Sequence, residues 1–194
     1  MMVSAAILAG GRSRRFLGRD KSALVVDGRT ILEHQVAELS RMTGDIVLVG
    51  SQRSCDGLRA VPDRVPGCGP LGGLHTAFAE TRGDALVVVA CDMPHVTAPL
   101  LKYLLALTAE ADIVVPRTRC GLHPVCAAYA RSCAAVVAEH LAEKRLAMMA
   151  LFDVLRVRIV HEAELRAFGD GDRLLANVNT PEELALLEGL PCSG

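Results

Sequence analysis

Residues 3–21 read VSAAILAGGRSRRFLGRDK and residues 85–94 read ALVVVACDMP. In both stretches an apolar run of strand length ends in residues that suit a bound ligand, two adjacent glycines in the first and an aspartate in the second. Continuous runs rich in Val, Ile and Leu are typical of parallel strands that are buried on both faces. In open parallel sheets, ligands bind beyond the carboxyl ends of the strands, where these residues are expected.

In the rest of the chain, predicted strands alternate with predicted helices. Further strands are predicted at 45–50, 112–115, 124–129 and 155–160, and helices at 30–41, 71–80, 98–107, 132–143 and 181–188. Thr30, followed three residues later by Glu33, has the spacing of a capping box at the first helix. This order predicts an α/β fold with a three-layer, doubly wound, mostly parallel sheet. With 194 residues, no long linker and no repeat, residues 1–194 are expected to form a single domain.

The composition narrows the choice of partners. The formal net charge is -1, which excludes the strong basic bias of a nucleic-acid binder, and the aromatic residues are only 3% of the chain. The apolar runs are too short to span a bilayer, and the N-terminal one does not have the form of a signal peptide. Seven cysteines without CxxC spacing favour small buried residues in a reducing compartment over a zinc site. We therefore expect a cytoplasmic protein with no nucleic-acid or membrane partner.

The glycine-rich loop after the first strand is a candidate phosphate site. Gly10 and Gly11 lack a Cβ, so their backbone N–H groups can approach an anion closely. Arg15 and Lys21 follow and can neutralise phosphate charge. The loop is neither a Walker motif nor GxGxxG. The competing interpretation is a flexible basic surface loop.

Two aspartates are the candidate metal and nucleotide ligands. Asp92 follows a buried strand directly, and Mg²⁺ prefers one or two carboxylates together with phosphate oxygens and water. The alternative for Asp92 is a plain loop or helix-capping carboxylate. Asp63 precedes a glycine- and proline-rich loop at 64–74 that could wall a base pocket or serve only as a helix entry.

The motifs, taken together, resemble a known family. LAGGRSRRFLGRDK at 8–21, Asp63 with GPLGGL at 69–74, CDMP at 91–94, His123-Pro124 and NVNTPEEL at 177–184 resemble the molybdenum cofactor guanylyltransferases, also called the molybdopterin-guanine dinucleotide biosynthesis protein A family. The resemblance spans nearly the whole chain. It implies a Rossmann-like fold of the nucleotide-diphospho-sugar transferase type and transfer of GMP from GTP to molybdopterin with release of pyrophosphate. The opening motif is shared with other nucleotidyltransferases, whereas NVNTPEEL narrows the assignment.

The resemblance also assigns roles along the nucleotide. It implies that Leu8, Ala9 and Gly10 line the guanine and ribose. Gly11 and Arg15 would contact the phosphates, and Lys21 the triphosphate. Asp63 would lie beside the nucleotide, and Asp92 would hold Mg²⁺, with Mn²⁺ as an alternative, together with GTP. Lys21, Arg15 and Asp92 would be the catalytic residues.

The substrate side is assigned by the same resemblance. Asn177 and Asn179 would lie on the pterin or metal side, and His123 on the substrate side. The chain departs from the family at Phe16-Leu17, where one residue is added to the loop and Phe replaces Met, and at Ser51, where many members have a nucleotide-contacting Asn.

Several functions are compatible with this reading of the sequence. The expected substrates are GTP and molybdopterin, with the protein a monomer or weak oligomer that transiently contacts molybdenum cofactor carriers. The first alternative is cytidylyl transfer to molybdopterin, or nucleotidyl transfer to a sugar phosphate or another cofactor. The second alternative is a non-catalytic nucleotide-binding protein.

Overall fold

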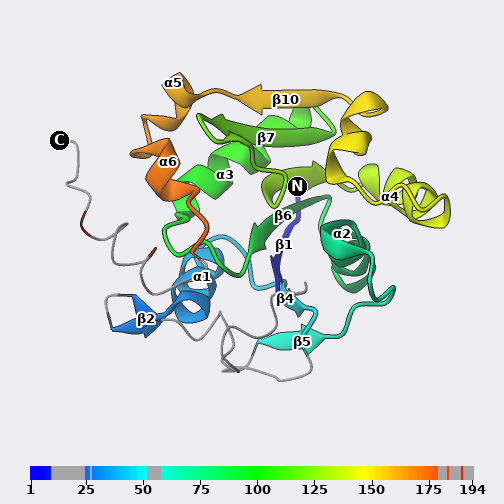
Figure 1. The fold of residues 1–194 in the computed structure, drawn as a ribbon, viewed down its shortest axis with the longest axis horizontal. Helices are drawn as coiled ribbons and strands as arrows, with labels where there is room; N and C mark the ends of the chain where they lie inside the picture. Colours follow the sequence, from blue (N-terminus) through cyan, green and yellow to red (C-terminus); the bar gives the residue numbers. More distant parts are fainter. Residues whose placement is uncertain (10–24, 27, 52–57, 179–182, 184–188, 190–194) are drawn as a thin grey trace.

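A computed structural model describes residues 1–9, 25–26, 28–51, 58–178, 183 and 189 of the chain, and Figure 1 shows their arrangement. The strands are β1 (Val3–Leu8), β2 (Val25–Val26), β3 (Arg29–Thr30), β4 (Ile46–Val49), β5 (Arg59–Val61), β6 (Ala85–Ala90), β7 (Ile113–Thr118), β8 (Gly121–Leu122), β9 (Cys126–Ala130) and β10 (Val157–Val160). The helices are α1 (Ile31–Ser40), α2 (Gly69–Glu80), α3 (Ala98–Ala106), α4 (Cys133–Ala142), α5 (Glu162–Leu165) and α6 (Gly171–Leu174), with 3₁₀ turns η2 (Leu107–Ala109) and η3 (Met148–Asp153).

The central sheet is mostly parallel, which confirms the predicted fold class. Its strand order is β10-β7-β9-β6-β1-β4-β5, and β8 pairs with β7 at one end. Strand β9 runs antiparallel between β6 and β7, an orientation that the apolar pattern at 124–129 does not specify. Strands β2 and β3 form a separate two-stranded ribbon ahead of α1.

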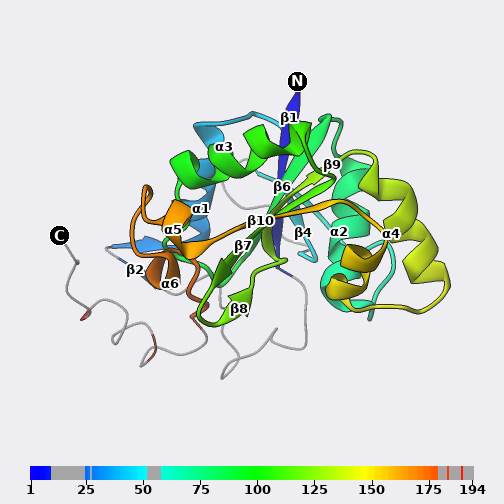
Figure 2. The same ribbon diagram turned by 90° about the horizontal axis from the view of Figure 1, so that it is seen from above.

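Helices cover both faces of the sheet, as Figure 2 shows from above. One core cluster joins one face to α1 and α3, and the other joins the opposite face to α2, α4 and η3. Within the part of the chain that the structure describes, no helix is long and apolar enough to cross a membrane.

The predicted capping box begins α1. The Thr30 hydroxyl accepts the Glu33 backbone N–H at 3.1 Å, and the Glu33 carboxylate accepts the Thr30 backbone N–H at 2.7 Å. Two otherwise unpaired N–H groups are thereby satisfied at the helix start. These contacts lower the pKa of the Glu33 carboxyl, with the backbone hydrogen bond from Thr30 as the largest cause.

Candidate active site

The parallel strands end in register at one edge of the sheet. Leu8 is the register partner of Val49 on one side and of Ala90 on the other, and Val49 is the partner of Val61. The residues that follow β1, β4, β5 and β6 therefore emerge side by side, which is where open α/β sheets bind their ligands.

The sequence-predicted residues in the described part of the chain gather along this carboxyl edge. Leu8 is buried at the end of β1, Ala9 donates its N–H to Val49 at 2.8 Å, and half-buried Ser51 follows Gly50. Gly50 adopts a positive φ of 84°, which favours glycine at this strand exit. Five predicted residues lie outside the described part of the chain: Gly10, Gly11, Arg15, Lys21 and Asn179.

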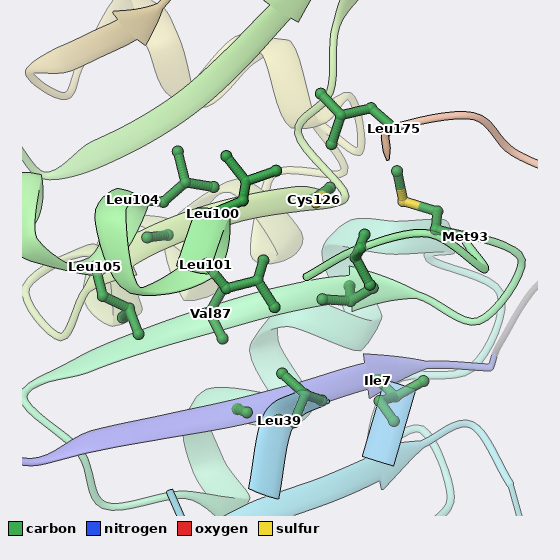
Figure 3. Packing of buried hydrophobic residues seen from close by; sticks show 14 of the residues in the cluster. Ile7, Leu39, Val87, Met93, Leu100, Leu101, Leu104, Leu105, Cys126 and Leu175 are labelled. Atoms are coloured by element: carbon green, nitrogen blue, oxygen red, sulfur yellow. The ribbon is translucent and has the colours of Figure 1, made fainter. Parts of the chain in front are cut away.

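Asp92 lies in the turn that closes β6. The Met93 N–H donates to the Ala90 carbonyl at 3.3 Å, so Asp92 is the third residue of a four-residue turn. Met93 beyond it is completely buried, and Figure 3 shows it with Leu175 at the carboxyl end of β1 and β6. The turn thus carries a carboxylate at the edge of the sheet while its next residue is anchored in the core.

The segment that begins with Asn177 reaches Asp92 from the other end of the sequence. The Asn177 side-chain amide donates to Asp92 Oδ1 at 3.1 Å, and the Val178 backbone N–H donates to the Asp92 carbonyl at 2.7 Å. Val178 is buried in a small cluster with Val26 and Ile31. The NVNTPEEL motif therefore begins with a direct contact to the candidate metal ligand.

The antiparallel strand β9 brings His123 to the same edge. Because β9 runs against β6, the residues that precede it emerge at the carboxyl ends of the parallel strands. Val125, in this connection, accepts the Ala90 N–H through its carbonyl at 2.8 Å. His123 Nε2 lies 2.9 Å from the Thr118 hydroxyl, which also accepts the Cys120 N–H.

Burial lowers the pKa of His123, and the nearby Asp172 charge opposes that shift. The desolvation favours a neutral ring. A neutral imidazole can hydrogen-bond the Thr118 hydroxyl either as acceptor or as donor at Nε2, depending on its tautomer. His123 is thus oriented by Thr118 as a neutral hydrogen-bonding group.

Asp63, a predicted nucleotide contact, begins a loop over residues 63–68 that is held against α2. The Arg64 N–H donates to Thr76 Oγ1 at 3.0 Å, while the Arg64 guanidinium pairs with Glu80 at 2.7 Å. The hydrogen bond from Arg64 is the largest cause of the lowered pKa of Glu80. Glycine at position 72 lets this loop lie close to α2, because a Cβ there would lie 2.9 Å from the Cβ of Cys68. The GPLGGL motif therefore serves to pack the Asp63 loop on its helix.

The donors at this edge fit a magnesium or manganese ion. They comprise the Asp92 carboxylate and the Asn177 amide, and hard divalent cations take such oxygen ligands together with phosphate oxygens and water. Among the described residues no group of three or more His, Cys, Asp or Glu side chains could hold a metal by itself.

The first turns of α1 pack against two segments that flank the candidate site, which the motifs did not indicate. His34 Nε2 lies 2.8 Å from the carbonyl of Val26, directly after the glycine-rich segment. Ile31 packs against both Val26 and Val178. The period of four residues at 31, 35 and 39 was the available signal, because it places Gln35 on the apolar face of the helix.

A family model and two similar proteins agree on the family of this chain. The model of the MobA-like NTP transferase domain matches residues 5–161. A probable molybdenum cofactor guanylyltransferase of Pelotomaculum thermopropionicum is 33% identical over 95% of this chain and 91% of its own length. A molybdenum cofactor guanylyltransferase of Desulfosudis oleivorans is also 33% identical, over 96% of this chain and 94% of its own.

A solved structure agrees with these relatives. The crystal structure of molybdopterin-guanine dinucleotide biosynthesis protein A from Archaeoglobus fulgidus superposes with a TM-score of 0.78 at 25% identity, covering 95% of this chain and 96% of that one. The family match covers most of the chain and includes the strands, the Asp63 loop, Asp92 and His123. The chain belongs to the MobA-like NTP transferase family.

Proposed function

We propose that this chain transfers GMP from GTP to molybdopterin, forming molybdopterin guanine dinucleotide and pyrophosphate. The observation that carries the proposal is the contact of Asn177 with Asp92 at the carboxyl edge of the sheet. It joins the CDMP motif at 91–94 to the NVNTPEEL motif that resembles the guanylyltransferases. The names of the relatives that are 33% identical over most of the chain support the same substrates.

The chemistry requires positioning and charge neutralisation rather than a strong base. An ionised oxygen of the molybdopterin phosphate attacks the α-phosphorus of GTP in line, a new P–O bond forms, and the bond to the β-phosphate oxygen breaks. The nucleophile is already deprotonated, so no residue has to remove a proton. Alignment of the two substrates and neutralisation of the spreading negative charge supply the rate enhancement.

Asp92 would hold the divalent metal, which we propose to be Mg²⁺ with Mn²⁺ as an alternative. When bound, the ion neutralises phosphate charge. Asn177 restrains the Asp92 carboxylate from one side. Gly10, Gly11, Arg15 and Lys21 are proposed to bind the phosphates, and Leu8, Ala9, Ser51 and Asp63 to line the nucleotide.

His123 and the two asparagines of the NVN segment are proposed to face the molybdopterin. His123 is fixed by Thr118 and offers a neutral ring that can hydrogen-bond a polar ligand without adding charge. The pterin would therefore approach from the side of β7 and β9, while the nucleotide lies toward β1, β4 and β5. In this proposed arrangement the molybdopterin phosphate would meet the α-phosphate of GTP near Asp92.

A direct assay tests the proposal. The purified protein is incubated with Mg²⁺, molybdopterin and each of GTP, CTP, ATP and UTP, and pyrophosphate and the dinucleotide product are measured. We expect pyrophosphate only when GTP and molybdopterin are both present. A preference for CTP would instead assign cytidylyl transfer, and turnover with a sugar phosphate in place of molybdopterin would assign another acceptor. Tight GTP binding without pyrophosphate release would indicate a non-catalytic binder.

A further inference from the structure

Gln35 is a completely buried polar residue on α1 that contacts the turn containing Asp92. Its side-chain nitrogen donates to the carbonyl of Ala90 at 2.7 Å and to the carbonyl of Met93 at 2.9 Å. These carbonyls belong to the first and fourth residues of the turn, so one amide group spans the turn from end to end. Asp92 lies between the two anchored carbonyls.

Other parts of the chain also hold this turn: the Cys91 N–H donates to the Leu8 carbonyl at 3.1 Å, and the Val178 N–H donates to the Asp92 carbonyl at 2.7 Å. The turn's own hydrogen bond, from Met93 N–H to the Ala90 carbonyl, is 3.3 Å long, beyond the usual range for N–H···O bonds. The two bonds from Gln35 are shorter and add a second tether, to the Met93 carbonyl. Gln35 therefore supplies two hydrogen bonds that hold the turn against α1.

The same helix holds the far end of the loop. Glu38, one turn after Gln35 on α1, accepts the Ala98 N–H at 2.7 Å, at the start of α3. Residues 90–98 are thus attached to α1 at both ends. A movement of the turn relative to α1 would have to break at least one of these contacts.

The side-chain carbonyl oxygen of Gln35 indicates that this residue does more than stabilise the fold. Gln35 Oε1 is buried and has no hydrogen-bond partner in the described structure. A buried carbonyl without a partner is unfavourable, and an apolar side chain of similar size would avoid it. The two donor contacts to the Asp92 turn are what a glutamine provides here and a methionine does not.

We propose that Gln35 is a positioning residue that sets the direction of the Asp92 carboxylate toward the divalent metal. It acts through the Ala90 and Met93 carbonyls and touches neither substrate nor metal. The inference rests on the proposed function, in which Asp92 is the metal ligand. Residues that hydrogen-bond a metal ligand directly typically account for a 10- to 100-fold difference in metal affinity, and the lower end of this range is expected for Gln35, which acts through the adjacent carbonyls.

The test measures metal binding directly. Mn²⁺ is titrated into the protein with saturating GTP and followed by electron paramagnetic resonance, for wild type, Gln35→Met, Asp92→Asn and Ser4→Ala. Gln35→Met is expected to raise the Mn²⁺ dissociation constant roughly tenfold or more. High Mn²⁺ is expected to restore the GTP-dependent turnover of this variant to within a few-fold of wild type.

Ser4→Ala is the matched control. Ser4 is also completely buried and also bridges two groups, donating to Asp45 at 2.6 Å and accepting the Gly83 N–H at 2.7 Å. It lies in β1 near the opposite, amino end of the sheet. Its removal is expected to lower thermal stability while leaving the Mn²⁺ dissociation constant within twofold of wild type.

The outcomes separate the inference from the function on which it rests. If Asp92→Asn abolishes Mn²⁺ binding and Gln35→Met behaves like Ser4→Ala, the positioning role is wrong and the metal assignment stands. If Asp92→Asn binds Mn²⁺ as wild type does, the metal assignment fails, and the inference fails with it. Should Gln35→Met not fold, Gln35→Asn, whose shorter amide cannot reach both carbonyls, replaces it with the same expected result.

Discussion

At the scale of single residues, the Asp92 carboxylate is the group on which the proposed chemistry depends most directly. Asp92→Asn keeps the size of the side chain and removes its charge. We expect metal-dependent turnover to fall roughly 100-fold or more, the magnitude associated with losing one preorganised electrostatic contact to the transition state. Asn177→Ala keeps the carboxylate and removes only the 3.1 Å hydrogen bond to it, so a smaller loss of about tenfold is expected. Steady-state rates over a range of Mg²⁺ concentrations measure the loss of turnover in both variants. Equal losses would contradict the expectation that Asp92→Asn is the more damaging change.

His123 gives a prediction about pH and stability. Burial lowers its pKa below the ordinary value of 6.5, so below that pH the unfolded chain takes up a proton that the folded chain does not. The stability contributed by the neutral ring is present above 6.5 and is lost as the pH falls toward the folded pKa. Urea unfolding at pH 7.5 and 5.5 should show a smaller pH-dependent loss for His123→Gln than for wild type. Val154→Ala, an exposed change without a titrating group, should retain the wild-type loss.

At the scale of elements, the start of α1 depends on the Thr30 capping box. Thr30→Ala removes the hydroxyl that accepts the Glu33 N–H, and we expect the free energy of unfolding to fall by about 1 kcal/mol. Thr30→Ser retains the hydroxyl and is expected to remain close to wild type. Denaturation by urea compares the three proteins. A loss in Thr30→Ser as large as in Thr30→Ala would point to the methyl group rather than the cap.

Helix α2 contains two adjacent glycines with different neighbours. A Cβ at Gly72 would lie 3.0 Å from the Val65 backbone oxygen and 2.9 Å from the Cys68 Cβ, whereas at Gly73 the nearest atom is a Leu8 side-chain carbon at 3.2 Å. Alanine favours a helix over glycine by up to about 1 kcal/mol, but the backbone at 65–68 can yield only by moving the Asp63 loop. We expect Gly72→Ala to destabilise the protein by roughly 1–3 kcal/mol and to weaken GTP binding. Gly73→Ala should have a smaller effect on both. Thermal unfolding and GTP titration test the pair.

At the scale of the whole molecule, the sequence predicts the α/β class and the long strands but not the complete sheet. Strands β1 and β6 could be predicted because each is a long apolar run, and α1 because its apolar period coincides with a cap. Strand β5, which has only three residues, gave no such signal. The antiparallel direction of β9 is not contained in its composition, because a strand buried on both faces looks the same in either direction.

The candidate site could be predicted as a set of loops but not as a set of contacts. Asp92 was expected at a strand end, and the structure places it at the carboxyl edge of the sheet. Its hydrogen bond with Asn177 joins positions 85 residues apart, which no local pattern encodes. Gln35 was overlooked because glutamine is usually a surface residue on a helix, although its spacing from Ile31 and Leu39 placed it on the buried face.

Asp92 is held from two directions by parts of the chain that are far apart in sequence. Gln35 fixes its turn from α1, and Asn177 contacts its carboxylate from the segment after α6. Because both act on one group, the effects of Gln35→Met and Asn177→Ala on Mn²⁺ affinity should not add. A double-mutant cycle is expected to give a coupling of about 0.5–3 kcal/mol, the range for residues that share a partner.

The cycle that combines Gln35→Met with Ser4→Ala supplies the comparison. Ser4 has no partner in common with Gln35, so the two changes should be additive in Mn²⁺ affinity within about 0.5 kcal/mol. Additivity in both cycles would mean that the helix and the NVN segment act on Asp92 independently. Coupling in the first cycle alone would mean that α1 and the NVN segment orient the Asp92 carboxylate together. Full metal affinity would then require both segments to be packed against the turn that contains Asp92.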